Sequence, residues 1–174
     1  MQADLIHRIY EASVVPELWP AVLDEIAVVA DASGGLVFSA RKVLHWTASG
    51  SVRNVVEEYV NDGWFTRCPR RLCIFNQAEP SFFVEQDFWS EDQISADPIY
   101  RDFFRPRGLG WSAGTGLQVP TGDNIVFSIE RAFERGPIER EYVERLNALR
   151  PHLARSALVT ARLGLQRAQG AADA

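Results

Sequence analysis

The sequence has few of the features that mark metal-binding, disulfide-bonded or nucleic-acid-binding proteins. Its 174 residues include two cysteines, Cys68 and Cys73, whose number and spacing suit neither a disulfide framework nor a zinc site. Lys and Arg are scattered and the formal net charge is −5, so no basic stripe predicts a nucleic-acid face. The cysteine usage favours a reducing cytoplasm.

The sequence also lacks a leader and a membrane segment. The N-terminal run "MQADLIHRIYEA" has no basic region followed by an apolar core, which a signal peptide requires. No apolar run approaches the roughly eighteen residues of a membrane span. We therefore expect a cytoplasmic protein with no membrane partner.

Motifs for cofactor binding and nucleophilic catalysis are missing as well. The glycine-rich runs "SGG" and "SAGTG" match neither the phosphate loop nor the dinucleotide fingerprint, and we interpret them as strand glycines. No G-x-S-x-G elbow is present. His7, His45 and His152 lie in separate predicted elements, without a partnering ligand or base. The sequence predicts no cofactor, no metal and no enzymatic activity.

One catalytic alternative involves Cys68. Arg67, Arg70 and Arg71 surround it in the sequence, a setting that lowers a thiol pKa and gives a reactive thiolate. The other interpretation, which the sequence favours, is a small hydrophobic residue packed against an aromatic cluster.

The sequence is rich in aromatic side chains. Hydrophobic residues make up 47% of the chain and charged residues 24%, which is typical of one folded domain. Of the nineteen aromatic residues, fifteen lie between Phe38 and Phe127, and five of the nineteen are tryptophans. Large flat side chains with a polar handle often line an apolar ligand pocket, and ordinary core packing is the alternative. We expect a pocket.

The hydrophobic pattern predicts a mixed α and β protein. In the first half of the chain, 3.6-residue spacing indicates helices and β-branched, aromatic runs indicate strands. The predicted elements are a helix over 3–12, a second helix ending near Ala30, a hairpin over 34–49 with a turn at Arg41–Lys42, and a helix over 51–62, capped by Ser51 and ended by Gly63.

The second half continues the same alternation. The predicted elements are an aromatic loop over 64–74 with a helical segment after Pro69, a short strand in "PSFFVEQ", a helix starting at Ser90 or Asp97 and stopping at Gly108, a hairpin through "PTGDN", and a helical tail from Pro137 that Pro151 kinks or splits. This order predicts an α+β fold with an antiparallel sheet of about five strands. We expect a core over 1–134 and a helical tail over 135–174, which serves packing, dimerisation or linkage to another domain.

Three runs in the sequence resemble a known family. They are "VEEYVNDGWFTRCPR", "FFVEQDFWSED" and "FFRPRGLGWSAGTGLQVPTGDNIVFSIERA". Together they resemble the autoinducer-binding domain of LuxR-type quorum-sensing transcription regulators. The resemblance covers roughly residues 15 to 150 as an order of elements. At the level of residues it is confined to Tyr59, Gly63, Trp64, Pro69, Gly108, Leu109 and Pro120.

The resemblance implies a PAS- or GAF-like α/β/α sandwich that holds a ligand between the sheet and the helices of one face. In the family, the tyrosine at the Tyr59 position lines the pocket and an aromatic at Trp64 helps to close it. An aspartate before the proline accepts the ligand's amide N–H, and a tryptophan one helical turn before the tyrosine donates to the lactone carbonyl. Here Cys68 and Val55 occupy those two positions.

Both polar anchors for an acyl-homoserine lactone are therefore missing. Each lost hydrogen bond costs about 1 to 3 kcal/mol, so the two losses weaken lactone binding by about a hundredfold or more. We expect a small apolar or aromatic ligand instead. The candidate ligand-binding residues are Tyr59, Trp64, Cys68, Val55, Phe38, Trp46, Phe83, Trp89, Trp111 and Phe127.

The family carries a C-terminal helix-turn-helix, which this sequence does not contain, so DNA contact would require a further domain. The sequence predicts either a ligand-sensing domain separated from its DNA-binding domain or a stand-alone module. A homodimer seam over Leu146, Leu149, Leu153, Ala157 and Leu163 is one interpretation of the tail, and packing on its own sheet is the other. The alternative function is an interaction module that captures a regulator or partner protein without a ligand and exposes apolar seams.

Overall fold

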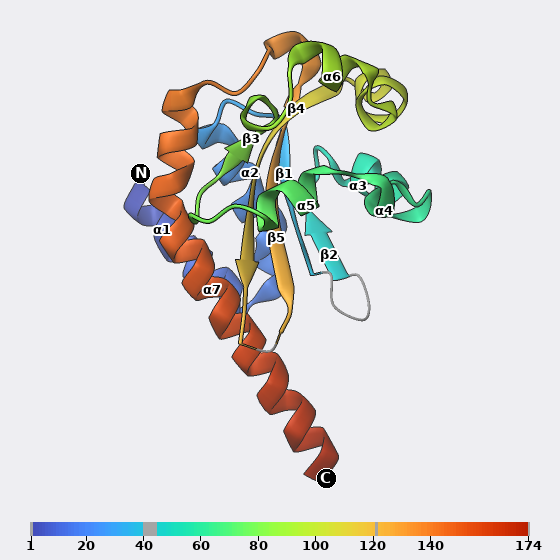
Figure 1. Cartoon of the computed structure of the whole chain (residues 1–174). Helices are drawn as coiled ribbons and strands as arrows, with labels where there is room; N and C mark the ends of the chain where they lie inside the picture. The colour runs from blue at the N-terminus through green and yellow to red at the C-terminus, as the bar shows by residue number, and fades with distance from the viewer. Residues whose placement is uncertain (1, 40–44, 121, 174) are drawn as a thin grey trace.

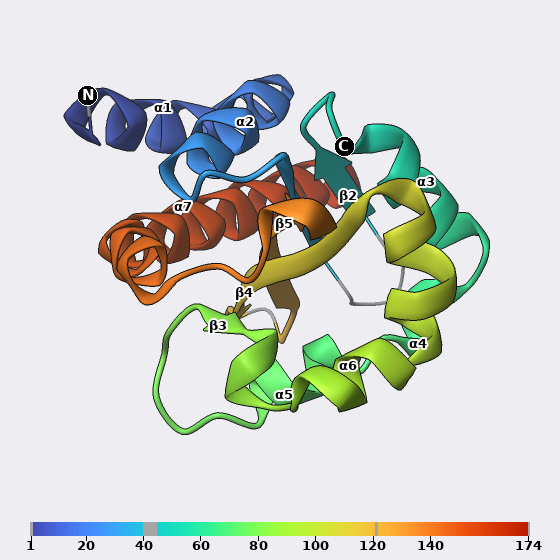
Figure 2. The same ribbon diagram turned by 90° about the horizontal axis from the view of Figure 1, so that it is seen from above.

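A five-stranded antiparallel sheet with helices on both faces forms the protein (Figures 1 and 2). The computed structural model describes residues 2–39, 45–120 and 122–173, with side chains as far as Thr160. The strands lie in the order β2-β1-β5-β4-β3. Their bounds are β1 Gly34–Ser39, β2 His45–Ala48, β3 Phe83–Val84, β4 Leu109–Gln118 and β5 Asn124–Ala132. The predicted α+β sandwich is confirmed, with both hairpins in place.

Three helices cover one face of the sheet: α1 (Gln2–Val14), α2 (Trp19–Val29) and α7 (Arg140–Asp173) (Figure 2). Their apolar residues recur at helical spacing and are fully buried in one cluster with the sheet, as Ile9, Leu23 and Leu146 show. Burial of these side chains anchors the three helices to the sheet.

The other face carries shorter helices. They are α3 (Arg53–Asn61), α4 (Trp64–Arg67), α5 (Arg70–Phe75), α6 (Glu91–Ala96) and a π-helical segment over Ile99–Phe104. Short 3₁₀ turns occupy Pro16–Leu18, Glu85–Asp87, Arg105–Arg107 and Phe133–Arg135. A second cluster of buried residues, rich in aromatic rings, fills the space beneath these helices.

Two helix boundaries follow local signals that the sequence shows. The side chain of Ser90 accepts a hydrogen bond from the Gln93 N–H in a capping box that starts α6. Gly63 follows α3 in the left-handed region at φ 76°, which glycine adopts without the strain of a Cβ. The predicted cap Ser51 is wrong, because its hydroxyl donates to the Ser33 carbonyl and α3 begins two residues later.

Three further expectations need correction, and a fourth concerns residues that the structure does not describe. Trp64–Arg67 forms a helical turn where a loop was expected. Ser90 and Asp97 were alternatives, yet each precedes a separate helical segment. The tail helix begins at Arg140, three residues after Pro137. The expected turn at Arg41–Lys42 lies outside the described residues.

The sequence predicts a kink or a split of the tail at Pro151, and the split is wrong. Helix α7 runs through Pro151 as one helix. A proline removes one N–H from the helix ladder, and packing on both sides of it offsets that loss, since Leu149 and Leu153 are both buried against the sheet side. Arg150 adds hydrogen bonds from its guanidinium to Thr115 Oγ1 and to the Gly116 carbonyl of β4.

The glycines of β4 allow α5 to lie close to the sheet. A Cβ on Gly116 would lie 2.6 Å from the Phe75 ring, and one on Gly114 would lie 2.9 Å from Ile74 Cδ1. Both distances are shorter than van der Waals contact, so a larger residue at either position requires the Phe75 or Ile74 side chain, or α5 itself, to shift. Among the described residues, no helix is long and apolar enough to cross a membrane.

Candidate functional site

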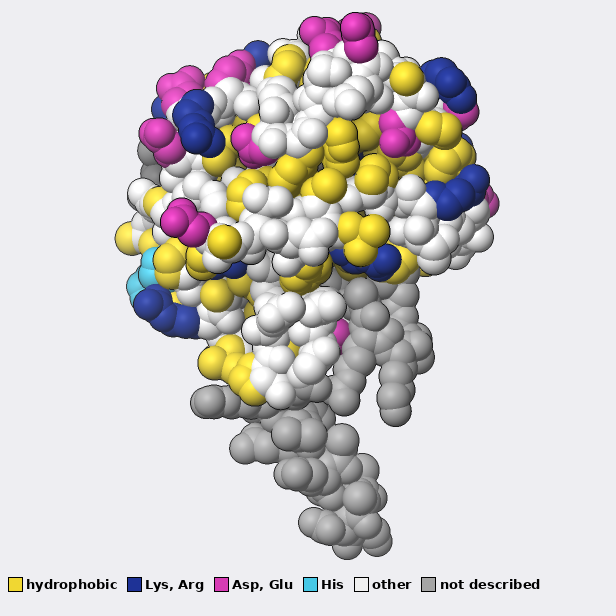
Figure 3. Space-filling model, in the orientation of Figure 1, with side chains coloured by type: hydrophobic (Ala, Val, Ile, Leu, Met, Phe, Trp, Pro, Cys, Tyr) yellow, Lys and Arg dark blue, Asp and Glu magenta, His cyan; other side chains and the backbone are white. Residues whose placement is uncertain are grey.

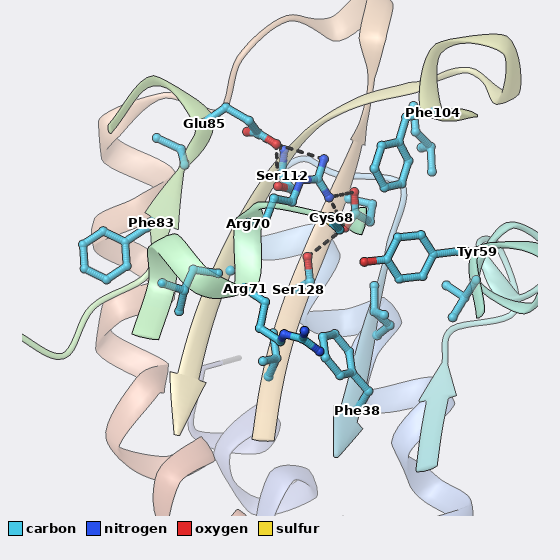
Figure 4. Close-up of a pocket in the computed structure, with 18 of the residues that line it drawn as sticks. Phe38, Tyr59, Cys68, Arg70, Arg71, Phe83, Glu85, Phe104, Ser112 and Ser128 are labelled. Atoms are coloured by element: carbon cyan, nitrogen blue, oxygen red, sulfur yellow. Dashed lines mark hydrogen bonds and ion pairs between the residues drawn. The ribbon is translucent and has the colours of Figure 1, made fainter. Parts of the chain in front are cut away.

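A cavity of about 50 Å³ lies between the sheet and the helices of the second face (Figure 4). This volume accommodates a few water molecules. The surrounding side chains are mainly apolar, with a group of polar and charged residues among them. The lining consists of Leu36, Phe38, Val52, Val55, Val56, Tyr59, Cys68, Arg70, Arg71, Ile74, Phe83, Val84, Glu85, Phe88, Trp89, Phe104, Leu109, Ser112, Gly114, Val126, Ser128 and Glu130.

Helix α3 and strand β5 bring their lining residues to the cavity by simple periodicity. Val52, Val55, Val56 and Tyr59 follow the i, i+3, i+4, i+7 spacing of one helical face. Strand β5 contributes alternate residues, Val126, Ser128 and Glu130, because successive side chains of a strand point to opposite faces.

Strand β4 reaches the cavity with residues that simple alternation would place on opposite faces. Leu109 and Ser112 both line it, although they are three positions apart. The pairing of β4 with β5 shifts register between Leu109 and Trp111, so Gly110 forms a β-bulge. The bulge turns Leu109 and Ser112 to the same side, where Ser112 pairs across the strands with Glu130.

Arg70 lies at the centre of the polar group and bridges two buried carboxylates (Figure 4). Its Nη1 donates to Glu130 Oε1 at 3.1 Å and to Oε2 at 3.2 Å. Its Nη2 lies 3.0 Å from Glu85 Oε1, and its Nε donates to the Tyr100 hydroxyl at 2.8 Å. The guanidinium also lies over the Phe104 ring, 4.4 Å from its centroid. We call Arg70, Glu85 and Glu130 the charged triad.

Hydroxyl groups complete the surroundings of the two carboxylates. Ser112 donates to Glu85 twice, through its N–H at 3.0 Å and its hydroxyl at 2.6 Å. The Tyr100 hydroxyl donates to the same carboxylate at 3.2 Å. Ser128 donates to Glu130 Oε1 at 2.7 Å. These bonds hold the charged triad in one arrangement, since buried charges are stable only when they are paired and hydrogen-bonded.

The surroundings shift the pKa values of two members of the charged triad, Glu85 and Arg70. Burial raises the pKa of Glu85, against the opposing effects of Arg70 and the Ser112 bonds. For Arg70, burial acts to lower the pKa, but Glu130, Tyr100 and Glu85 together raise it well above its ordinary value. Arg70 is therefore a permanent cation, whereas Glu85 gains a proton more readily than an exposed glutamate.

Tyr59 and Cys68 face each other at the side of the cavity (Figure 4). Burial raises the pKa of Tyr59 well above its ordinary value and also raises the pKa of the Cys68 thiol. A thiol with a raised pKa remains protonated at neutral pH, so the reactive-thiolate interpretation is wrong. Cys68 instead packs in the aromatic cluster as a buried small residue.

Half-buried aromatic side chains form a rim beside the cavity. The Phe83 and Phe88 rings lie 5.7 Å apart between centroids, and Phe88 and Trp89 lie 5.5 Å apart. We call these three residues the aromatic rim. On the same side of the molecule, a band of hydrophobic side chains crosses the surface between the α6 region and the α5 region (Figure 3).

Six of the ten sequence-predicted site residues line the cavity: Val55, Tyr59, Cys68, Phe38, Phe83 and Trp89. The other four lie elsewhere. Trp64 packs against Phe103, and Trp46 lies beneath Arg53 at the edge of the same cluster. Trp111 stacks on Phe133 and donates from Nε1 to its carbonyl. Phe127 lies on the opposite face of the sheet, against Trp19.

Sequence reasoning missed the two acidic members of the charged triad and the serines that bind them. Arg70 was noted only as a neighbour of Cys68. The available signal was the alternation of β5, where Ser128 and Glu130 interleave with Phe127 and Ile129. Such alternation usually indicates a solvent-exposed polar face, and only the helices that cover this face show that it is buried.

The cavity has a mainly apolar wall and a polar floor, which consists of the charged triad with Ser112 and Ser128. Its described residues offer no metal site. Within the ranges that the structure describes, no group of three or more His, Cys, Asp or Glu residues is placed to hold a metal ion. His152 bonds the Tyr10 hydroxyl through Nδ1 on the far face of the sheet, away from the cavity.

Solved structures share this fold at low sequence identity. CepR2 from Burkholderia cenocepacia, an N-acylhomoserine lactone dependent LuxR family transcription factor, superposes with a TM-score of 0.63 at 17% identity, over 93% of this chain and 97% of that one. The VqsR ligand-binding domain from Pseudomonas aeruginosa gives 0.60 at 14% identity, over 94% and 96%.

SdiA gives a similar match. SdiA in complex with octanoyl-rac-glycerol superposes with a TM-score of 0.60 at 16% identity, over 94% of this chain and 61% of that one. This chain thus spans 61% of the SdiA chain. No family model matches the sequence, and no curated protein sequence matches it significantly. The chain has the fold of LuxR-type ligand-binding domains, which confirms the resemblance at the level of the fold.

Proposed function

We propose that this chain is the ligand-sensing, non-catalytic domain of a LuxR-like transcription regulator. The observation that carries the proposal is the cavity beneath α3 and α5, enclosed by apolar side chains around the charged triad. Concave sites with mostly apolar walls and few convergent polar groups are the usual form of small-molecule sites. The fold supports the proposal, because the structures that share it include ligand-binding domains of transcription regulators.

The proposed ligand is a small apolar or aromatic molecule other than an acyl-homoserine lactone. Cys68 and Val55 line the cavity at the two positions where the family has an aspartate and a tryptophan. Neither side chain replaces the hydrogen bonds of those anchors. The cavity holds only a few water molecules, so an aryl or acyl guest displaces side chains of the aromatic rim, which are half-buried and border the surface.

Strand β4 offers a route from the cavity to the tail. Ser112 and Gly114 of β4 line the cavity, and the Arg150 guanidinium of α7 bonds Thr115 and Gly116 of the same strand from the other face. We propose that ligand binding biases the direction of α7, and with it whatever follows residue 170. Any contact with DNA would be made by such a following domain.

A homodimer and a cytoplasmic location stay predictions. Leu146, Leu149, Leu153 and Ala157 of the expected seam are buried in the chain's own core, which supports the packing interpretation of the tail for these four positions. The side chain of Leu163 lies outside the described residues. A dimer through the tail would therefore use other residues of α7.

A thermal-shift screen of the purified protein tests the proposed function. A ligand present at a hundred times its Kd stabilises the native state by about 2.7 kcal/mol, which raises the melting temperature by several degrees. We expect at least one aryl compound, acyl compound or host extract to do so. If none shifts the transition, the sensing proposal fails and the interaction-module alternative gains support.

Substitutions at the cavity connect a positive screen to this site. Tyr59→Phe removes one hydroxyl and should weaken ligand binding by about 1 kcal/mol if the ligand bonds it. Trp64→Ala should weaken binding by loss of packing against the cluster that surrounds the cavity. Lower stability with unchanged ligand affinity in both variants would assign these residues to the core instead.

Cys68→Asp tests whether the geometry of the family carries over. The variant places a carboxylate at the position that corresponds, by the resemblance, to the family's amide acceptor, and we expect it to bind an acyl-homoserine lactone more tightly than the parent protein does. Cys73→Asp is the matched control, because Cys73 does not line the cavity. Equal lactone responses in the two variants would contradict the transfer of geometry.

A further inference from the structure

The charged triad carries more negative than positive charge. One guanidinium faces two carboxylates, and the side chains of Glu85 and Glu130 are only 2% and 5% exposed. Arg71 also lines the cavity, but its guanidinium stacks on the Phe65 ring, 4.3 Å from the centroid. A guest that binds within the charged triad therefore meets an excess of acceptors and one net negative charge, while the Arg71 guanidinium keeps its positive charge against the Phe65 ring.

Glu130 accepts hydrogen bonds from fewer donor groups than Glu85, although each carboxylate has one oxygen that accepts only one bond. Each carboxylate has about four lone-pair sites. Glu85 accepts two bonds from Ser112 and one from Tyr100, and Arg70 Nη2 lies against it. Glu130 accepts from Ser128 and Arg70 through Oε1, but its Oε2 receives only the 3.2 Å bond that Arg70 Nη1 shares between both oxygens. Glu85 Oε2 also accepts one bond, from the Ser112 N–H at 3.0 Å, so the least satisfied acceptor of the polar floor is Glu130 Oε2, whose one donor is shared.

We propose that the guest of this pocket carries an N–H donor, as an amine or an amide, that binds Glu130 Oε2 while its apolar body lies among the aromatic and aliphatic side chains. The inference rests on the proposed ligand-sensing function. A donor nitrogen adds a bond to this least satisfied acceptor, and a cationic nitrogen also offsets the excess negative charge. A carboxylate would approach Glu130 with the same sign of charge at a buried position, where repulsion is screened less than in bulk water.

The charged triad also contains a donor that an amide can use. Arg70 Nη2 is buried and has no well-aligned hydrogen-bond acceptor, although it lies at ion-pair distance from Glu85. An amide group presents a carbonyl acceptor and an N–H donor side by side. It can therefore accept from Arg70 and donate to Glu130 without breaking the ion pairs of the triad.

Calorimetric titration with three probes of one skeleton tests the inference. 2-Phenylethylamine, phenylacetamide and phenylacetate share the ring and differ in the head group. At pH 7 we expect the amine and the amide to bind the wild-type chain at least tenfold more tightly than phenylacetate. Equal or tighter binding of phenylacetate would overturn the inference and leave the sensing function standing.

Variants assign the selectivity to Glu130. Glu130→Gln removes one negative charge, and we expect the ratio of amine to phenylacetate affinity to fall by about tenfold. Glu134→Gln is the matched control, because Glu134 is exposed and does not line the cavity, and its ratio should equal that of the wild type. An unchanged ratio in a folded Glu130→Gln variant would contradict the assignment.

Two provisions keep the test decisive. If Glu130→Gln does not fold, Ser128→Ala removes one donor to Glu130 while it keeps the charge, and the preference for the amine should persist or grow. Loss of the preference in that variant would overturn the inference. If none of the three probes binds but another compound raises the melting temperature in the thermal-shift screen, only the proposal of an N–H donor is overturned. If no probe binds and no compound in the screen shifts the transition, the proposed sensing function is overturned as well.

Discussion

The two faces of the sheet differ in what fills them. Beneath α1, α2 and α7 lies a core dominated by aliphatic side chains, in which Leu23, Ile129 and Leu146 are completely buried. Beneath α3, α5 and α6 lie aromatic rings, a cavity and the charged triad. The first face also buries a charge, since Arg131 is 1% exposed and bonds the Ala30 and Pro137 carbonyls and Glu139. The second face differs because its buried charges line a cavity.

Strand β5 shows how one segment serves both faces. Phe127 and Ile129 point into the aliphatic core, while Ser128 and Glu130 point to the cavity. A charged residue in a central strand is costly without partners, and Arg70 supplies the partner from α5. The first face therefore supports the fold, and we propose that the second face supports recognition.

The largest expected effect is the loss of the cation in the charged triad. Arg70→Ala leaves Glu85 and Glu130 buried without a counter-ion and should lower the free energy of unfolding by about 3–5 kcal/mol. Urea titration followed by circular dichroism measures it. Arg71→Ala is the control, with an expected loss of about 1 kcal/mol or less, because this side chain only stacks on a ring.

A substitution in the aliphatic core should act on stability alone. Leu146→Ala creates a cavity at a fully buried position and should cost about 2–5 kcal/mol of unfolding free energy. Leu72→Ala, at a side chain that is 65% exposed, should cost little. If Leu146→Ala also changed the relative affinities of pocket ligands, the two faces would not be separate in function.

The close packing of α5 on β4 can be tested with a substitution that places a new side chain between them. Gly116→Ala places a methyl group 2.6 Å from the stiff Phe75 ring, so this ring or α5 itself must shift, at a cost of about 1–3 kcal/mol. Because α5 carries Arg70, we also expect a weaker ligand response in the thermal-shift assay. Gly50→Ala, where nothing lies within 4 Å of the new Cβ, should leave both properties nearly unchanged.

The smallest effect concerns pH. The pKa of Glu85 is higher in the folded state than its ordinary 4.5, because burial penalises the charged form. The folded chain therefore binds this proton more tightly than the unfolded chain, so the Glu85 contribution to stability is complete below pH 4.5 and declines as pH rises through the folded-state pKa. Glu85→Gln should remove this decline from plots of unfolding free energy against pH. Parallel profiles for wild type and variant would contradict the assignment.

Much of the fold was predictable from periodicity and turn residues. The helical spacing in α1, α2 and α3, the glycine-flanked hairpins and the Ser90 cap all follow local rules that the chain obeys. The failures lie where tertiary contacts outweigh local signals. Pro151 does not divide α7, because the leucines on either side of it are fixed in the core, and Ser51 bonds a distant carbonyl instead of capping α3.

The site was predictable only in part. The resemblance and the aromatic content identified Val55, Tyr59 and Cys68 and three further rings that line the cavity. They did not identify Glu85 or Glu130, which lie 45 residues apart in the sequence and meet only through Arg70. Local pattern cannot distinguish a polar strand face that meets water from one that helices cover.

The sequence by itself determined the helices, the strands and the aromatic character of one face, because these depend on side-chain periodicity and composition. Only the tertiary structure decided where the charges lie. A β-bulge at Gly110, the close approach of α5 over the β4 glycines and the alternation of β5 bring one arginine between two glutamates. Such pairing depends on long-range contacts, and burial then fixes its energy and its chemistry.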